Sequence, residues 1–278
     1  MGDIYPYKAM KRKVKTADFL ASHPVFSLEE ATLALAPSGG RLGTVERLKH
    51  HLGTGRLKLV ARGIYSVVPA GAPGGQAQPD PLLVAAAARP DGIFSYHSAL
   101  ELLGAAHSVW TQCTVFTGQR RRKLVFGGMT VRFLEHPEPL RRDGALHLGT
   151  LRIERRGKLL EATGPERTLV DGFRRSKMAG GLEELVQSAG GFPILDIDLL
   201  EEVLARYDAA KLWAATGWFL EHFQRSFHVP EDVLSRIERH RPRAVQYLER
   251  NSRGGALAPR WNLILPQIIM NFGGSNEP

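Results

Sequence analysis

Cationic, imidazole and hydroxyl side chains recur along one short stretch, residues 41–62, of this 278-residue chain. Eight of these side chains are candidates for binding: Arg41, Thr44, Arg47, His50, His51, Arg56, Lys58 and Arg62. A guanidinium can donate two hydrogen bonds to a guanine edge in the major groove, and Lys or Arg can neutralise backbone phosphates. These residue types therefore predict contacts with double-stranded DNA.

The apolar spacing around these residues predicts a helix that begins near Arg41. Its packing side is expected to hold four residues at helical spacing, Leu42, Val45, Leu48 and Leu52. Arg47 and His50 then fall on the opposite side, with Thr44 and His51 on the flank, where all four side chains can reach a groove. Gly53 and Gly55 are expected to end the helix, because glycine tolerates the left-handed conformation of a helix exit.

A basic hairpin is expected directly after this helix. Residues 57–61 and 64–68 are strand-like runs joined across Arg62-Gly63, where glycine can supply a positive φ. Arg56, Lys58 and Arg62 lie on or beside the hairpin and are placed to contact phosphates.

Two shorter helices precede the basic one. Residues 16–23 should place Phe19 and Leu20 inward, and Ser27 to Glu30 form an S-x-x-E capping box that opens a second helix. Pro37 ends that helix. Three helices followed by a hairpin predict a winged helix-turn-helix domain over residues 1–69.

The charge distribution favours the same partner. Of a net charge of +9, residues 1–69 contribute +6, from 11 Lys and Arg against 5 Asp and Glu. A basic arm, which includes Lys11, Arg12 and Lys13, is expected to lie along a phosphate backbone or in a minor groove. The alternative is a solvated basic face or a patch for a membrane surface.

A second domain is expected over residues 82–278, after a linker at 70–81 that is rich in small residues and proline. Strand-like runs occur at 112–116, 129–133, 151–154 and 159–161, and helical patterns dominate from Asp198 onward. Thr163 to Glu166 is read as a second capping box, and Asp198 as a helix N-cap. The predicted class is α+β, with a winged helix-turn-helix followed by a larger mixed domain that has a helical C-terminal part.

A further basic cluster lies in this second domain, at Arg120, Arg121, Arg122 and Lys123. Four adjacent cations at a strand end are a candidate clamp for the phosphates of nucleic acid. A solvated hairpin tip explains them equally well.

Four segments, in this order, resemble the AbiEi family of antitoxins from type IV toxin-antitoxin systems. They are residues 59–65 (LVARGIY), 96–104 (YHSALELLG), 164–171 (GPERTLVD) and 260–263 (RWNL). The resemblance implies an N-terminal winged helix-turn-helix that binds inverted repeats in its own promoter, and a C-terminal domain needed for antitoxicity. It also implies a nucleotidyltransferase toxin as the functional partner, with direct contact left open. Two-fold operators imply two protein copies on DNA, whether the free protein is a monomer or a dimer.

The sequence lacks the spacing that the common catalytic motifs require. A metal-dependent nuclease would carry an E-x-K pattern, and no lysine has Glu, Asp or Gln two positions before it. Gly190-Gly191 and the pair Asp196 and Asp198 imitate a nucleotidyltransferase motif, but the spacer between them is too short. We therefore expect no catalytic residue, no metal site and no cofactor. A nuclease with a winged helix, or an antitoxin that binds its toxin directly, remains the alternative.

Composition also sets the expected compartment. The sequence contains no run of eighteen apolar residues, and no apolar segment follows its basic N-terminus. The single cysteine, Cys113, excludes an internal disulfide. These features predict a cytoplasmic protein without membrane contact.

Overall fold

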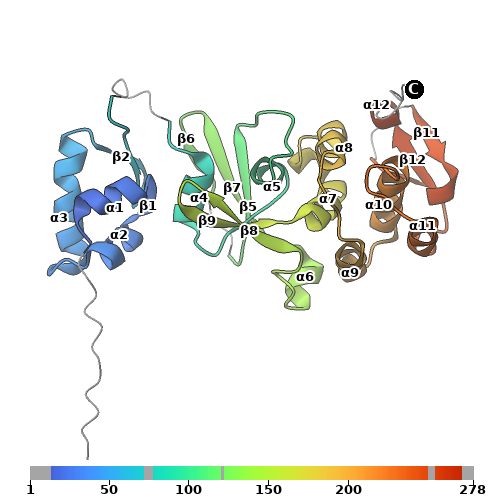
Figure 1. The fold of residues 1–278 in the computed structure, drawn as a ribbon, viewed down its shortest axis with the longest axis horizontal. Helices are drawn as coiled ribbons and strands as arrows, with labels where there is room; N and C mark the ends of the chain where they lie inside the picture. Colours follow the sequence, from blue (N-terminus) through green and yellow to red (C-terminus); the bar gives the residue numbers. More distant parts are fainter. Residues whose placement is uncertain (1–13, 72–77, 120–121, 250–253, 271–278) are drawn as a thin grey trace, which may run out of the picture. The chain divides into compact units, whose positions relative to one another are not determined.

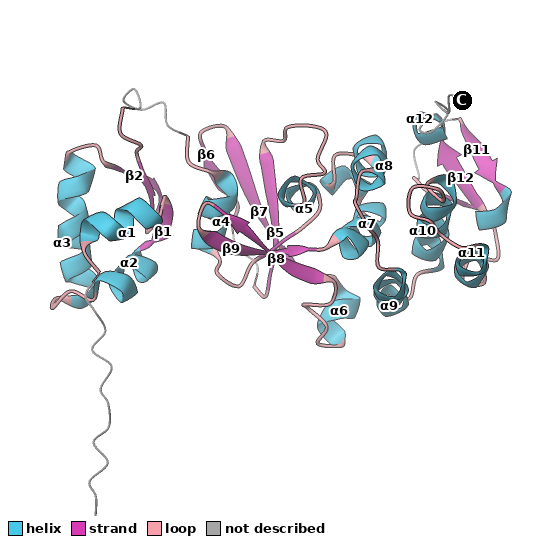
Figure 2. Cartoon of the chain, viewed as in Figure 1, coloured by secondary structure: helices cyan, strands magenta, loops and turns pink. Residues whose placement is uncertain are grey.

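The computed structural model describes residues 14–71, 78–119, 122–249 and 254–270, and the chain divides into two compact units. The first unit comprises residues 1–90 and 155–158, and the second comprises residues 91–154 and 159–278. Both combine helices with sheet, so the chain is α+β (Figures 1 and 2). Among the described residues, no helix has the length and apolar character that a membrane span needs.

The first unit contains four helices and a three-stranded antiparallel sheet among its described residues (Figure 1). The sheet order is β1-β3-β2. In chain order the elements are α1 (Thr16–Ser22), β1 (Val25–Ser27), α2 (Leu28–Leu35), α3 (Gly40–Gly53), β2 (Leu57–Ala61), β3 (Ile64–Val67) and α4 (Pro81–Ala88). The three predicted helices and the hairpin are therefore confirmed, whereas β1 was not predicted.

Local signals explain the starts and ends of these elements. Ser27 accepts a hydrogen bond from the Glu30 amide, and Glu30 accepts one from the Ser27 amide, so the predicted capping box is confirmed. Gly63 has φ 75° at the turn between β2 and β3, which favours glycine. Phe19 and Phe26 are fully buried and pack edge-to-face, with ring centroids 5.0 Å apart.

The first unit extends beyond the boundary that was expected at the linker. Helix α4 packs on β1 and β3, and its residues from Leu82 to Ala87 are all buried. A helix that is apolar all round cannot remain on a surface, and the contacts of α4 with β1 and β3 place it in the first unit. Asp80 caps α4 by accepting from the Leu82 amide, and Arg155 donates to the same carboxylate at 2.7 Å.

The second unit is built on a six-stranded mixed sheet with the order β6-β7-β5-β4-β9-β8. Strands β5 and β7 pair in parallel, as do β4 and β9. Its elements up to β9 are β4 (Ile93–Phe94), α5 (His97–Leu102), β5 (Gln112–Thr117), β6 (Leu124–Phe126), β7 (Met129–Glu135), α6 (Glu138–Arg142), β8 (Thr150–Arg155) and β9 (Lys158–Thr163).

Helices dominate the rest of this unit, as the sequence predicted. They are α7 (Pro165–Arg174), α8 (Leu182–Gly190), α9 (Ile197–Tyr207), α10 (Ala210–His222), α11 (Glu231–Glu238) and α12 (Gln267–Met270), with short 3₁₀ turns η1 (Ser176–Met178) and η2 (Pro259–Trp261). A small sheet, β10-β12-β11, lies at the C-terminal end and consists of β10 (Gln246–Tyr247), β11 (Gly255–Ala258) and β12 (Leu263–Pro266).

Two helix starts in this unit differ from their predictions. The N-cap of helix α7 is Gly164, which has no side chain, and not Thr163, whose hydroxyl is hydrogen-bonded to that of Thr168 at 2.7 Å. Glu166 accepts from the Asp196 amide at 2.8 Å and not from the start of its own helix. The N-cap of α9 is Asp196, which accepts from the Leu199 amide, and not Asp198. Glu166 thus holds the residue that caps α9, and the cap of α9 lies two residues before the predicted one.

Candidate nucleic-acid interface

Helix α3 presents a different face from the one that its leucine spacing predicted. Thr44 and Leu48 are fully buried, whereas Leu42 is 78% exposed. Thr44 therefore belongs to the core and is not a side chain that reaches a groove. Its hydroxyl donates to the Gly40 carbonyl at 3.0 Å, so burial leaves it satisfied.

The turn before α3 explains this rotation of the helix. A Cβ on Gly43 would lie 3.3 Å from the Pro37 Cβ, and one on Gly39 would lie 3.1 Å from the Gly43 Cα. The turn thus packs closely on the side of α3 that carries Gly43 and its neighbour Thr44. Leucine spacing alone did not reveal this contact, because the close approach depends on glycine.

The two histidines of α3 differ in exposure. His50 is exposed, and His51 is half-buried with an Nδ1 that has no hydrogen-bond partner among the described residues. Burial, followed by the charges of Arg56 and His50, lowers the pKa of His51. At neutral pH the His51 imidazole is therefore an uncharged group at the edge of the outer face.

Two of the cations on α3 already have carboxylate partners. Arg41 lies 3.0 Å from Glu29, and Lys49 lies 2.6 Å from Glu46. All four side chains are more than 60% exposed, so each pair contributes only about 0–1 kcal/mol and can exchange its carboxylate for a phosphate. Glu46 lies on the outer face itself, which lowers the net positive charge there.

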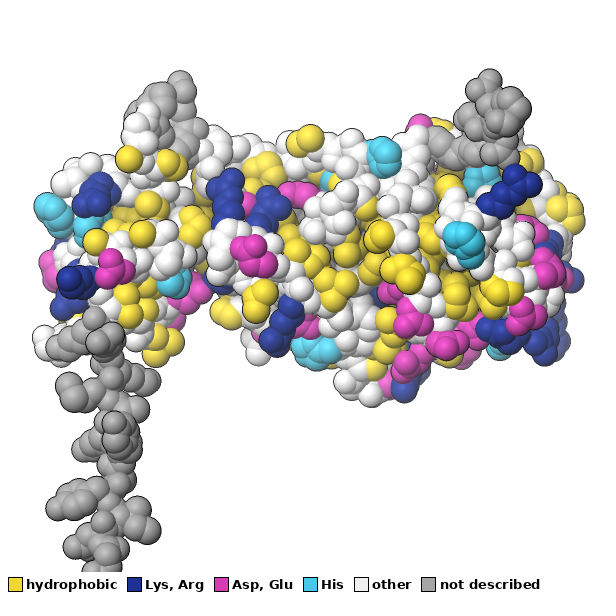
Figure 3. All heavy atoms as spheres, in the orientation of Figure 1, with side chains coloured by type: hydrophobic (Ala, Val, Ile, Leu, Met, Phe, Trp, Pro, Cys, Tyr) yellow, Lys and Arg dark blue, Asp and Glu magenta, His cyan; other side chains and the backbone are white. Residues whose placement is uncertain are grey.

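The remaining predicted cations have no ion-pair partner within the described part of the chain, and all are exposed. They are Arg47 of α3, Arg56 before β2, Lys58 of β2 and Arg62 at the β2–β3 turn. All four belong to the first unit, and Figure 3 shows Lys, Arg and His side chains on its visible face. This concentration of uncompensated positive charge is suited to a polyanion.

Other predicted contact residues fall elsewhere. Lys11, Arg12 and Lys13, with Arg120 and Arg121, lie outside the described residues. Arg122 and Lys123 are exposed at the start of β6 in the second unit. The structure thus describes only half of the Arg120–Lys123 cluster.

Side chains from the family-like segments form a buried polar network that the sequence did not reveal. Arg167 and Asp171 are fully buried, with Arg167 Nε 3.5 Å from the carboxylate. Arg167 also donates to the carbonyls of Leu146 and Leu148, and Tyr207 donates to Asp171. Burial raises the pKa of Asp171, and the Arg167 charge opposes that shift. The i, i+4 spacing of the two charged residues was the available signal.

The segment that begins at Tyr96 is also structural. Tyr96 is fully buried, and its φ of 55° is a backbone conformation that residues other than glycine rarely adopt. Ser98 accepts from the Thr114 amide at 2.8 Å. His97 stacks on Trp110 with ring centroids 4.9 Å apart, and its Nε2 lies 3.5 Å from Glu184. In a catalytic triad the serine and the carboxylate bind different nitrogens of the histidine ring. Ser108 and Glu184 both lie at Nε2 of His97, so these three residues do not form such a triad.

Arg260 and Trp261, from the last family-like segment, anchor the C-terminal part. Arg260 lies within 3.1 Å of carboxylates from α10 and α11, namely Glu221, Glu231 and Glu238. Hydrogen bonding to Glu231 is the main cause that raises the pKa of Arg260. Trp261 is fully buried and donates to Glu221 at 2.6 Å. Figure 3 shows the mixture of acidic and basic side chains at this end of the second unit.

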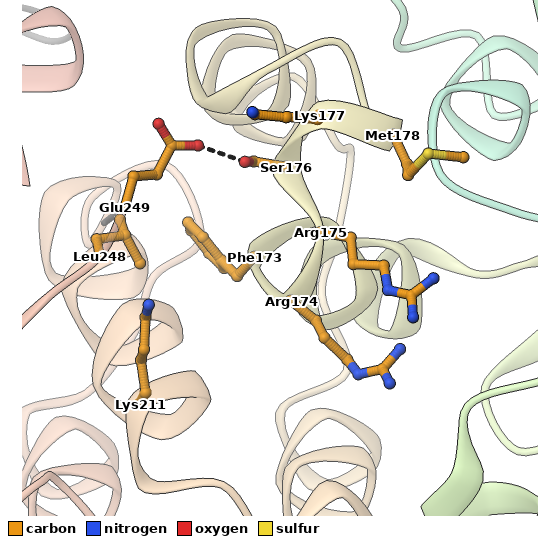
Figure 4. A pocket seen from close by; sticks show the side chains of 9 residues that line it. All are labelled: Phe173, Arg174, Arg175, Ser176, Lys177, Met178, Lys211, Leu248 and Glu249. Atoms are coloured by element: carbon orange, nitrogen blue, oxygen red, sulfur yellow. Dashed lines mark hydrogen bonds between the residues drawn. The ribbon is translucent and has the colours of Figure 1, made fainter. Parts of the chain in front are cut away.

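A pocket of about 420 Å³ opens beside the end of α7 (Figure 4). Ser176 donates to Glu249, and the side chain of Lys177 extends toward the side of the pocket on which Glu249 lies (Figure 4). The serine hydroxyl is thus committed to a carboxylate, and no described lining residue is a histidine that could take its proton. Elsewhere in the described ranges, no three His, Cys, Asp or Glu side chains are grouped as metal ligands would be.

Comparison with solved structures finds similarity to the RV2827C protein from Mycobacterium tuberculosis. The two chains share 18% sequence identity and a TM-score of 0.57, and the match covers 89% of this chain and 88% of that one. At this identity the similarity establishes a shared fold and nothing about activity. Neither the protein families nor the curated proteins compared with the chain include a match.

Proposed function

We propose that this protein is a double-stranded DNA-binding transcriptional autorepressor and the antitoxin of a type IV toxin-antitoxin system. In this proposal the first unit is a winged helix-turn-helix, with α3 as the recognition helix and the β2–β3 hairpin as the wing. The observation that carries it is the set of four exposed cations on α3 and the hairpin, none with a carboxylate partner among the described residues.

The arrangement of elements supports the DNA-binding part. The elements follow the order α1-β1-α2-α3-β2-β3, and β3 lies between β1 and β2 in the sheet. A helix that follows a short turn after another helix can enter a major groove, while a basic hairpin beside it lies on the backbone. In this reading Arg47 and His50 reach base edges, and Arg56, Lys58 and Arg62 contact phosphates.

Glu29 and Glu46 add a feature that composition did not suggest. Their pairs with Arg41 and Lys49 are exposed and must open for either cation to bind a phosphate. A carboxylate on the outer face repels phosphates that are wrongly placed, and it can accept from the N4 amine of cytosine. The interface is therefore built for discrimination as well as for charge.

The antitoxin part is supported by the family-like segments. Residues 96–104, 164–171 and 260–263 supply buried polar contacts and core packing to the second unit. Their resemblance thus concerns the architecture of that unit, and a nucleotidyltransferase toxin is the functional partner that the proposal names.

A gel-shift experiment tests the DNA-binding part. The full-length protein should retard the DNA upstream of its own gene at concentrations that leave a random duplex of equal length free, and inverted repeats should bind two copies. Equal binding to both duplexes would refute operator recognition. Metal-dependent cleavage of either one would favour a nuclease.

Co-expression tests the antitoxin part separately. If the neighbouring gene encodes a nucleotidyltransferase whose expression arrests growth, this protein should restore growth. Stable co-purification of the two proteins without any DNA shift would instead indicate an antitoxin that acts by direct binding.

A further inference from the structure

Helix α7 ends at Arg174, and Arg175 follows directly; the DNA-binding proposal uses neither arginine. Figure 4 shows the side chains of Arg174 and Arg175 extending side by side, away from Glu249. Neither guanidinium forms an ion pair with a residue that the structure describes. Arg174 lies over the Tyr207 ring at 6.0 Å from its centroid and is partly buried, whereas Arg175 is exposed. Two neighbouring like charges repel each other unless an anion lies between them.

These arginines line a second pocket, with a volume of about 360 Å³. Its other walls are residues 133–138, where β7 ends, and Arg141 of α6. Strand β7 runs parallel to β5, and ligands of sheets with parallel strands commonly bind beyond their carboxyl ends. The volume lies within the range of small-molecule sites, and Phe133 and Leu134 provide an apolar wall.

The carboxylates in the wall of this pocket pair with arginines other than Arg174 and Arg175. Glu135 lies 3.2 Å from Arg141, and Glu138 lies 3.9 Å from Arg142. Both carboxylates in the pocket wall therefore have arginine partners of their own. The dipole of α7 favours a cation in its last turn, which accounts for Arg174. Arg175 lies after the helix and is exposed to solvent.

His136 adds a polar group to the same wall. It is 4% exposed, and its Nδ1 has no hydrogen-bond partner in the described ranges. An unpaired buried nitrogen costs free energy, so a bound group that hydrogen-bonded to it would gain stability. The ring packs near Phe116, with centroids 5.5 Å apart.

We propose that Arg174 and Arg175 bind the phosphate group of a small phosphomonoester in this pocket, with His136 and the end of β7 forming the wall around it. Guanidinium groups match phosphate oxygens in a bidentate geometry, which an ammonium group does not. The site is independent of the proposed DNA interface. A free nucleotide and the 5′-phosphate end of a nucleic-acid strand share this chemistry.

Isothermal titration of the full-length protein tests the proposal, with adenosine 5′-monophosphate, adenosine and inorganic phosphate as probes. The monophosphate should bind at least about tenfold more tightly than adenosine, because the phosphate makes the charged contacts. Arg175→Gln should weaken binding of the monophosphate by about tenfold or more, and Arg175→Lys should restore only part of it. Arg225→Gln, which removes an exposed cation outside the pocket, should leave binding unchanged.

A second titration distinguishes the source of the phosphate. A short single strand with a 5′-phosphate is compared with its 5′-hydroxyl form, in the parent protein and in Arg175→Gln. The natural ligand is a strand end if two results are found. The 5′-phosphate should improve binding of the strand only in the parent, and this gain in affinity should exceed the gain from adenosine to its monophosphate. The proposal is overturned if adenosine and its monophosphate bind equally, if neither binds, or if Arg175→Gln binds the monophosphate like the parent. None of these outcomes depends on operator recognition by the first unit.

Discussion

The ammonium group of Lys158 lies 2.6 Å from Oε1 of Glu30, the residue whose other oxygen accepts from the Ser27 amide. A residue 128 positions later in the chain thus holds the capping box that starts α2. Both side chains are about 30% exposed, and Lys158 belongs to the first unit together with Glu30. The position of α2, on which α3 packs, therefore depends on residues 155–158 as well as on its own sequence.

This contact gives the first stability prediction. Ser27→Ala should lower the free energy of unfolding of the first unit by about 1 kcal/mol, because it leaves the Glu30 amide without its cap. Lys158→Ala should cost less, up to about 1 kcal/mol, since the pair is partly solvated. Urea denaturation of the single and double variants would measure both effects. Strict additivity in the double variant would show that the pair and the capping box are not coupled.

The burial of Thr44 predicts a clear separation between folding and DNA binding. Thr44→Val keeps the volume and removes a hydroxyl that bonds only within the helix, so DNA affinity should remain unchanged. Thr44→Gln should unfold the first unit or destabilise it by several kcal/mol, because a larger polar side chain does not fit a fully buried position. Circular dichroism and gel shift distinguish these results. A large loss of affinity in a folded Thr44→Val variant would return Thr44 to the DNA contacts.

Gly217 predicts a strong steric effect in the second unit. A Cβ at this position of α10 would lie 2.2 Å from Cζ3 of Trp261, which is fully buried. Gly217→Ala should therefore destabilise the second unit by about 1–3 kcal/mol, measured as a lower midpoint of thermal unfolding. Gly53→Ala is the matched control, because open space surrounds that position at the end of α3. Equal melting temperatures for the parent and Gly217→Ala would contradict close packing of α10 on Trp261.

His136 predicts a dependence of stability on pH. Burial, with the charge of Arg167 next, lowers the pKa of His136 from 6.5 to about 4 in the folded protein. The unfolded chain then binds more protons below pH 6.5, so stability should fall as the pH drops from about 6.5 to about 4. The slope from this group is at most about 1.4 kcal/mol per pH unit.

Urea titrations at several pH values, on the parent and on His136→Phe, measure this dependence. The variant should lose less stability than the parent over that range of pH, since a phenyl ring cannot take up a proton. His51, His97 and His222 also have lowered pKa values, so some dependence should remain in the variant. Identical slopes in both proteins would contradict a neutral, buried His136.

Local signals predicted most of the elements, whereas the arrangement of faces depended on contacts distant in sequence. Ser27 and Glu30, Pro37 and Gly63 are enough to place the ends of α2 and the hairpin turn. The strand β1 has only three residues and exists because it pairs with β3, which no local pattern indicates. The outward position of Leu42 follows from the packing of Pro37 and Gly43. Helix α4 belongs to the first unit because it packs on β1 and β3, which its apolar sequence alone does not indicate.

The candidate site was predicted in part for the same reason. Arg47, Arg56, Lys58 and Arg62 are exposed, because charged groups on a surface helix and hairpin need no special partner to remain in water. The hydroxyl of Thr44 donates to a carbonyl of its own helix, so a threonine can lie on either the buried or the exposed face. The residue type therefore did not predict which face Thr44 occupies. The pair of Arg41 with Glu29 joins two helices and required the fold, whereas the i, i+4 spacing of Arg167 and Asp171 was a signal in the sequence.

The salt dependence of binding to the upstream DNA tests the central claim most directly. Fluorescence anisotropy at about 50 and about 200 mM salt would compare the parent, Arg47→Gln/Arg62→Gln and the control Arg225→Gln. We predict that the double variant loses about tenfold to about a hundredfold in affinity. Its affinity should also depend less steeply on salt, because each lost phosphate contact reduces the number of counterions that binding releases. The control should match the parent in both respects. A double variant with the affinity and the salt slope of the parent would contradict DNA recognition by α3 and the hairpin.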